Sequence, residues 1–322
     1  MTKTMSRRLK RVVLWLAATA AFAVLGAAGL QALLSHLSIR NIPPPGRLVE
    51  LNGRQVHLLC AGEGSPTVIL EAGAGSLVWM SVFAEIAQLT QVCTYDRPGH
   101  GWSEPASSPR TAETMVQELK MLLQTAEIRP PYVLAGHSFG GVLMQLYAAR
   151  FPNDFEGVVL VDSSHPDQIH RTSDLERLES LVLALKFLGP LGLARILLPA
   201  MEGDPDSRDI VVREQERELL MTNRTLQTVV KEMSAMRQSL REVGDSSVDF
   251  GNKPLVVLTG GQRRAEWWHH MHEDLSRLST NSEWQVVDGA GHFIQHDRPD
   301  VVVDAVRRVI EKAEAKVDSP LP

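Results

Sequence analysis

The chain has 322 residues and a formal net charge of −5, with a globular share of apolar residues, so it is long enough for one large α/β domain or two ordinary ones. The charge is unevenly distributed, because residues 1–40 carry six basic side chains and no acidic one. The other residues therefore hold 27 basic and 38 acidic side chains. An acidic body argues against a nucleic-acid partner, which would need a basic face.

The basic N-terminus precedes a long apolar segment. Five positive charges come before an apolar run over Val12–Leu30, which continues after one glutamine to Leu34. A helix needs about 20 apolar residues to cross the hydrocarbon core of a membrane, whereas a cleaved signal peptide usually has an apolar region of about 7–15 residues. We expect a signal anchor that spans the membrane over 12–34, with a cytosolic tail at 1–11 and the rest exported. A cleaved signal peptide and a buried soluble helix are the alternatives.

The segment after this run predicts a spacer followed by an α/β domain. The sequence NIPPPGR at 41–47 predicts a stiff linker within 35–47, ahead of a domain over 48–322. Alternating residues on both sides of Asn52-Gly53 predict a β-hairpin. Strand-like runs then alternate with helical patterns, which predicts a mostly parallel sheet covered on both faces. The strands are expected at 67–71, 91–96, 132–136, 157–162, 254–260 and 283–289, and the clearest helices at 111–126, 139–151 and 300–316.

The alternation is interrupted once, between the strands at 157–162 and 254–260. Residues 165–249 show only helical pattern, and 180–201 hold more apolar residues than one amphipathic face requires. We predict a helical lid inserted at 165–249. Its helices either pack on each other and on the core or line a lipophilic pocket, and both can hold.

A serine motif follows the strand at 132–136. The sequence Gly136-His137-Ser138-Phe139-Gly140 fits G-x-S-x-G and leads into a helical segment. In this context the serine sits on a sharp, strained strand-to-helix turn, and the small flanking residues relieve crowding. The helix N-terminus adds N–H groups and a favourable dipole near developing negative charge. A glycine-rich helix cap is the alternative, but the context favours Ser138 as a nucleophile.

Four stretches of the chain together resemble the α/β-hydrolase family. They are EAGAGSLVW, YDRPGHGWSEP, GHSFGG and GAGHFIQHDRP, and the resemblance covers roughly residues 48–314. It implies a mostly parallel eight-stranded sheet with helices on both faces and a lid after the sixth strand. It also implies hydrolysis without a cofactor or a metal ion. The resemblance says little about the substrate.

The resemblance also implies the partners of Ser138. His292 lies on the loop after the last strand and is the expected base, which takes the serine proton and returns it to the leaving group. His296 is the nearby rival. The backbone N–H groups of Phe139 and Ala74 are the expected oxyanion donors.

The acid of the triad departs from the family's commonest pattern. Arg263 stands where most members place an aspartate, and Glu266 is the first acid after that strand. Asp162 ends the strand before the lid, 24 residues after Ser138, which resembles the dehalogenase-like branch. We expect Asp162 to orient His292. Glu266 is the alternative acid, and Asp162 would then only cap the next turn.

The two cysteines and a pair of histidines are further candidate sites. In the family's fold the second and fourth strands are antiparallel neighbours, so the resemblance implies a disulfide between Cys60 and Cys93 if the domain is exported. Two buried thiols are the alternative. His269 and His272 share a helical face, but no further ligands accompany them, so no metal site is expected.

These observations lead to one expected function. We expect a membrane-anchored serine hydrolase that cleaves small to medium apolar carboxylic esters on the periplasmic or extracellular side, or a secreted form of it after signal-peptide cleavage. A perhydrolase or carbon–carbon hydrolase with the same triad is an alternative, as is a non-catalytic binding module. A serine at position 138 disfavours epoxide hydrolases and haloalkane dehalogenases, which need a carboxylate nucleophile.

Overall fold

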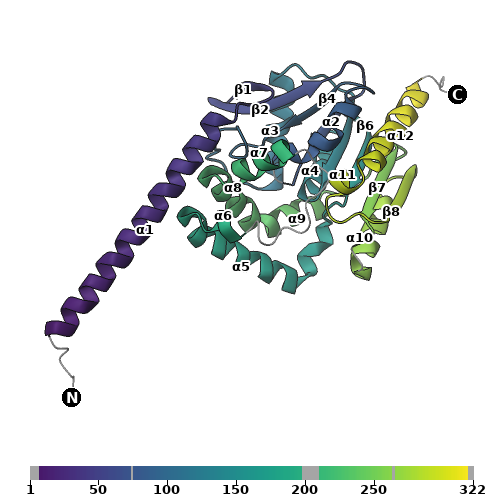
Figure 1. Ribbon diagram of the computed structural model, residues 1–322. Coiled ribbons are helices and arrows are strands. Elements are labelled where there is room, and N and C mark those ends of the chain that lie inside the picture. The colour runs from purple at the N-terminus through teal and green to yellow at the C-terminus, as the bar shows by residue number, and fades with distance from the viewer. Residues whose placement is uncertain (1–6, 74, 198–209, 263–264, 318–322) are drawn as a thin grey trace.

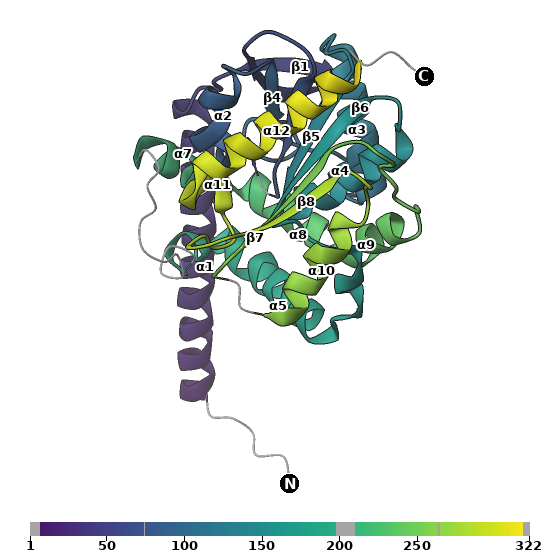
Figure 2. The same ribbon diagram turned by 90° about the vertical axis from the view of Figure 1, so that its right-hand side faces the viewer.

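A single eight-stranded sheet organises the molecule. The computed structural model describes residues 7–73, 75–197, 210–262 and 265–317. Figures 1 and 2 show the sheet inside a body of helices, from which the long N-terminal helix projects. The strand order is β1-β2-β4-β3-β5-β6-β7-β8. The strands are β1 Arg47–Leu51, β2 Arg54–Ala61, β3 Thr67–Glu71, β4 Val92–Tyr95, β5 Tyr132–His137, β6 Phe155–Val161, β7 Leu255–Gly260 and β8 Ser282–Val287.

One edge of the sheet is antiparallel and the rest is parallel. β1 and β2 form the expected hairpin, and both Asn52 (φ 53°) and Gly53 (φ 75°) have the positive φ that a tight two-residue hairpin turn requires. β2 is antiparallel to β4, and from β4 onward every neighbouring pair is parallel. This is the mostly parallel sheet that the sequence predicts.

Helices cover both faces because the central strands are apolar on both sides. In β3, Ile69 packs into one core, whereas Val68 and Leu70 pack into the other. The first core is covered by α3 Ala112–Thr125, α4 Phe139–Arg150 and α9 Met236–Gly244, and the second by α2 Met80–Ile86 and α12 Pro299–Val317. Figure 2 shows α12 lying across its face of the sheet.

The segment between β6 and β7 forms the lid, and its described residues are helical. Its elements are η2 Pro166–His170, α5 Thr172–Leu188, η3 Gly189–Leu191, α6 Ala194–Leu197, α7 Ile210–Leu220, α8 Asn223–Ser234 and α9. A small core within the lid joins Ala194, Met221 and Leu226. The remaining elements are η1 Ser76–Trp79, α10 Glu266–Ser276 and α11 Ile294–Asp297.

The N-terminal helix is longer than the sequence indicated. α1 runs without interruption over Arg7–Asn41, and its stretch Lys10–Asn41 is long and apolar enough to cross a membrane, with a mean hydropathy of 2.1. The spacer expected over 35–47 was therefore wrong in its first half, because only 42–46 separate α1 from β1. The helix ends just before the three prolines, which disfavour helical backbone in the residue that precedes them.

The C-terminal part of α1 is bound to the lid by polar contacts. The Gln31 side chain is buried and donates to the Met221 carbonyl oxygen at 2.8 Å and to Asn223 Oδ1 at 3.1 Å, and its Oε1 accepts from Arg195 Nε at 2.9 Å. Ser35 Oγ accepts the Asn223 backbone N–H at 3.1 Å. One turn further on, the Ser38 hydroxyl donates to a carboxylate oxygen of α7. We call these contacts the α1–lid joint.

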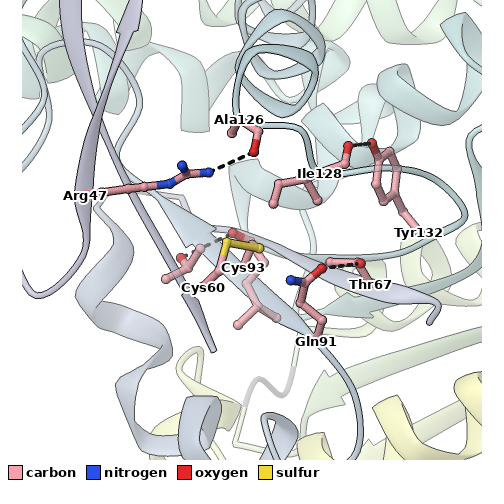
Figure 3. The surroundings of a disulfide bond; sticks show 10 residues. Arg47, Cys60, Thr67, Gln91, Cys93, Ala126, Ile128 and Tyr132 are labelled. Carbon is pink, nitrogen blue, oxygen red and sulfur yellow. Dashed lines mark hydrogen bonds between the residues drawn. A yellow bond between two sulfur atoms is a disulfide. The ribbon is translucent and has the colours of Figure 1, made fainter. Parts of the chain in front are cut away.

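A disulfide links the two antiparallel neighbours β2 and β4. Cys60 and Cys93 face each other directly in the strand register, and their sulfur atoms are bonded. Figure 3 shows this bond beside the start of β3, where the Thr67 hydroxyl donates to Gln91 Oε1 at 2.9 Å. The bond closes a 33-residue separation that includes the whole of β3, so it restrains the unfolded chain around the centre of the sheet.

Candidate active site

Ser138 lies on a strained turn between β5 and α4. Its backbone has φ 56° and ψ −125°, which is rare for a residue with a side chain. Glycines two residues before and two residues after Ser138 give the turn the room it needs. A Cβ on Gly136 would lie 2.6 Å from the Gly141 Cα, and a Cβ on Gly140 would lie 2.3 Å from the Glu71 carbonyl oxygen. Strain of this kind is characteristic of a functional position.

The structure brings Ser138, His292 and Asp162 together from three parts of the chain. Ser138 Oγ lies 3.0 Å from His292 Nε2, and His292 Nδ1 lies 2.7 Å from Asp162 Oδ2. A carboxylate only accepts hydrogen bonds, so His292 Nδ1 carries the proton and Nε2 keeps its lone pair for the serine hydroxyl. The His292 side chain is 26% exposed and Asp162 is buried. The three side chains thus lie in the order that a nucleophile, a base and an orienting acid would require.

Asp162 is held in place by more than His292. It follows β6 with a strained φ of 40°, and its Oδ1 accepts hydrogen bonds from the Gly260 backbone N–H and from Trp268 Nε1, each at 3.0 Å. These donors stabilise the ionised carboxylate in a buried position. Trp268 was not expected from the sequence, because it comes from α10, 106 residues further along the chain.

The alternative acid does not reach the imidazole. Glu266 is the first residue of α10 and is exposed, whereas Asp162 is in hydrogen-bond contact with His292. Arg263 lies outside the described residues. The geometry therefore favours Asp162 over Glu266.

Two further histidines support the loop that carries His292. His137 Nε2 lies 2.9 Å from the His292 carbonyl oxygen, which only accepts, so His137 donates there. Burial, together with the nearby His292, lowers the pKa of His137 to about 3, so the ring is neutral. His296, the rival base, is buried, and its Nε2 lies 2.9 Å from the Val78 carbonyl oxygen. His296 is therefore part of the framework.

The loop after β3 approaches the serine from the other side. A Cβ on Gly73 would lie 3.2 Å from the Ser138 Cβ, so only glycine leaves the approach fully open. The expected donor Phe139 is the first residue of α4, where backbone N–H groups have no partner within the helix. The other expected donor, Ala74, lies outside the described residues.

The motif YDRPGHG braces this loop on both sides of residue 74. Arg97 Nη2 donates to the Gly73 carbonyl oxygen at 2.7 Å, and Asp96 Oδ1 accepts the Ser76 backbone N–H at 2.8 Å. His57 Nδ1 lies 2.9 Å from the other Asp96 oxygen. Burial opposes ionisation of Asp96, but its hydrogen bonds, above all from His57, hold its pKa below the usual value.

A buried charge cluster connects the same loop to the lid. Arg97 forms ion pairs with Glu71 of β3 at 2.6 Å and with Glu232 of α8 at 2.9 Å, and all three side chains are buried. Burial opposes the charge on Glu232, but the attraction of Arg97 and the nearby His100 outweighs it and lowers the Glu232 pKa. The sequence alone did not predict this cluster, because Glu71 and Glu232 are 161 residues apart. One lies in a central strand and the other in a helix of the lid.

His272, one of the two histidines that share a face of α10, makes structural contacts. His272 is buried, its Nε2 lies 2.9 Å from the Ser163 carbonyl oxygen, and its Nδ1 lies 2.6 Å from the Thr259 hydroxyl. These contacts occupy both ring nitrogens, next to the strand tip that carries Asp162. Within the described ranges, no group of three or more His, Cys, Asp or Glu residues is arranged to hold a metal ion.

The strand order, the strained turn at Ser138 after β5 and the helical lid after β6 define an α/β-hydrolase fold. The model of the alpha/beta hydrolase family matches residues 51–305, and the chain belongs to that family. It is therefore a hydrolase, and the comparison confirms the resemblance seen in the sequence.

The known proteins to which the chain is similar leave its substrate open. The chain is 29% identical over 249 residues to YqjL, an uncharacterised protein of Bacillus subtilis, covering 75% of this chain and 82% of that protein. Among solved structures it is similar to an esterase from Exiguobacterium antarcticum (TM-score 0.67, 13% identity, 83% of this chain and 99% of that one). It is also similar to a putative acyltransferase from Salmonella enterica (TM-score 0.69, 18% identity, 84% and 98%). At these identities the structural matches establish the fold alone.

Proposed function

We propose that the protein is a serine hydrolase that cleaves carboxylic esters through an acyl-enzyme. The observation that carries this proposal is the continuous array from Ser138 Oγ through His292 to Asp162, with distances of 3.0 and 2.7 Å. An isolated serine hydroxyl is a weak nucleophile, and this array supplies the base and the charge that activate it.

The proposed reaction has two halves. His292 Nε2 takes the hydroxyl proton while Ser138 Oγ attacks the acyl carbon, and the Phe139 and Ala74 N–H groups would bind the oxyanion. The intermediate collapses, the bond to the alcohol breaks, and His292 protonates the departing oxygen. A water molecule then attacks the acyl-enzyme with His292 again as base, which releases the acid and restores the serine. Throughout, the Asp162 carboxylate would stabilise the imidazolium.

We further propose that α1 is retained as a membrane anchor. Gln31, Ser35 and Ser38 contribute hydrogen bonds to the lid, so removal of α1 would take these hydrogen bonds away from the lid. This supports the signal anchor over the cleaved signal peptide. The basic residues before α1 favour a cytosolic N-terminus and an exported domain.

Covalent labelling tests the hydrolase proposal. A fluorophosphonate probe reacts only with an activated serine, so the native protein should be labelled and Ser138→Ala should not be labelled or hydrolyse esters. Hydrolysis of p-nitrophenyl esters of increasing chain length would then define the acyl preference. Unchanged labelling of Ser138→Ala would contradict the proposal, and absence of labelling in the folded native protein would favour a non-catalytic module.

A further inference from the structure

We propose that the lid rests on the surface of the membrane that α1 spans, with an apolar face of α5 and α6 inserted among the lipids. This inference rests on the proposed anchor. The inserted side chains are Leu183 and Phe187 of α5 and Ile196 of α6, which we call the lid apolar face. No role in the α/β-hydrolase chemistry described above requires these residues.

The length of α1 fixes where the membrane ends. The uninterrupted apolar run Val12–Leu30 has 19 residues, which span roughly 28 Å as a helix. The hydrocarbon core of a bilayer is about 30 Å thick. The outer boundary of the hydrocarbon therefore lies close to Leu30. The next residue, Gln31, is already buried against the lid.

The α1–lid joint holds one part of the lid at that level. Gln31 bonds to Arg195 of α6, and a Cβ on Gly192 would lie 3.3 Å from the Gln31 side chain. In the sequence, Phe187 precedes Gly192 and Ile196 directly follows Arg195. They are thus within a few residues of the point where α1 leaves the hydrocarbon. Figures 1 and 2 show α5 at the end of the body toward which α1 projects.

The lid apolar face leaves large apolar side chains in contact with water, which is energetically unfavourable. Leu183, Phe187 and Ile196 are 58%, 64% and 69% exposed, and Leu183 and Phe187 lie four residues apart on one side of α5. Large apolar side chains gathered at one place mark an interaction surface. A bilayer is the occupant that α1 already places at this height.

A groove beside the face is consistent with lipid contact. It lies between α5 and α8, has a volume of about 580 Å³ and is lined by apolar residues that include Leu183, Leu226 and Val230. Lys186, Lys231 and Glu179 also line it. Glu179 is paired with Arg237, and the two lysines would be near lipid phosphates at the membrane surface. The face and the groove therefore combine apolar insertion with positive charge, as at membrane-binding surfaces.

The contact can be tested with a fluorescent label in liposomes. No cysteine in the described residues is free, so Phe187→Cys in the full chain can carry an environment-sensitive nitrobenzoxadiazole label. The same label at Phe22→Cys of α1 is the control inside the hydrocarbon core. The label at the exposed Glu311→Cys of α12 is the control on the surface away from the membrane. With lipids brominated on their acyl chains, we expect blue-shifted emission and quenching at 187 and 22, and neither change at 311.

Each other outcome overturns the proposal in a distinguishable way. Quenching at 22 without quenching at 187 would leave the anchor and reject the membrane-bound lid. No quenching at either position would reject the anchor as well. A blue shift at 187 that persists in detergent and is insensitive to brominated lipid would show that another protein surface covers the face.

An activity measurement separates the lid contact from the hydrolase proposal. Phe187→Glu should slow hydrolysis of an ester embedded in the liposomes while leaving hydrolysis of a short water-soluble ester unchanged. Equal rates on the embedded ester, or a parallel loss on both esters, would contradict a membrane role for this side chain. Absence of activity in the native protein would contradict the proposed function but would not alter the fluorescence result.

Discussion

At the residue scale, the buried carboxylate of Asp162 is the group on which the proposed chemistry depends most sharply. Asp162→Asn keeps the size of the side chain but removes the charge that stabilises the His292 imidazolium. A comparable change in a serine-protease triad lowers kcat by about 10⁴, so we expect a loss on the order of 10²–10⁴ in kcat. Steady-state kinetics with a soluble ester measure the loss.

Glu266→Gln is the matched control for that change. Glu266 is exposed at the start of α10, so its neutralisation should alter kcat only slightly. The reverse ranking would transfer the role of the acid to Glu266. Thermal unfolding of both variants is needed, because Asp162 also accepts hydrogen bonds from Gly260 and Trp268.

The neutral His137 imidazole makes the stability of the domain depend on pH. Its pKa is about 3 in the folded protein, against an ordinary value of 6.5. The unfolded chain therefore binds a proton at this position as the pH falls below about 6.5, and the folded protein does not. Stability from this group is complete above pH 6.5 and is lost progressively as the pH falls toward 3.

Between pH 7 and pH 5, protonation of His137 in the unfolded chain lowers the free energy of unfolding by about 2 kcal/mol. Urea unfolding of the full chain in detergent at the two pH values measures it. His137→Gln keeps a donor for the His292 carbonyl oxygen but cannot titrate, so the fall in stability should be smaller by about that amount. An unchanged pH dependence in this variant would show that other groups cause the acid sensitivity.

The sequence could predict the residues of the candidate site but not what holds them. Ser138 and His292 lie in local motifs, and Asp162 follows from its place at a strand tip. Trp268 and Arg97 act through contacts with residues far along the chain, and such contacts leave no periodicity or spacing in the sequence. The positions of the proposed reacting groups were therefore easier to predict than those of their supports.

At the scale of elements, α8 connects the lid to the loop beside Ser138. Glu232 of α8 holds Arg97, and Arg97 in turn holds the Gly73 carbonyl oxygen. Glu232→Gln should weaken this hold, because the amide lacks the charge that balances the buried guanidinium. We expect kcat to fall more than KM changes, since the loop is proposed to bind the oxyanion.

Glu179→Gln is the corresponding control on the lid surface. Glu179 pairs with Arg237 at 2.9 Å, and both side chains are exposed, so the pair contributes little. Its kcat and melting temperature should stay near those of the native protein. A Glu232→Gln variant with a lower melting temperature but unaltered kcat would mean that the cluster serves stability alone.

The elements of the sheet were predictable because their patterns are local, whereas the docking of α1 was not. Strands buried on both faces appear as continuous apolar runs, and the Asn52-Gly53 turn has a strong signal. Ser35 and Ser38 carry no such signal, since isolated serines are compatible with a helix or a linker. Only their contacts with α7 and α8 reveal that α1 continues into the folded body.

At the scale of the whole molecule, the α1–lid joint predicts that the chain keeps its N-terminal helix, and the basic residues before that helix predict an exported domain. A reporter that works only outside the cytosol should be active when it is fused after Pro322. An N-terminal tag should remain on the same chain. Extraction should require detergent.

Neutralising the basic residues before the helix provides the control for orientation. Replacing Arg7, Arg8, Lys10 and Arg11 by glutamine removes most of the charge that we propose retains the N-terminus in the cytosol, so the exported fraction should fall. Loss of the N-terminal tag from an otherwise exported chain would indicate cleavage. The lid would then have to fold without the Gln31, Ser35 and Ser38 hydrogen bonds, each worth about 1 kcal/mol. Because those contacts bury part of α1 in the body, we expect that α1 is not cleaved from the chain. The hydrolase domain should then be held against the outer surface of the membrane.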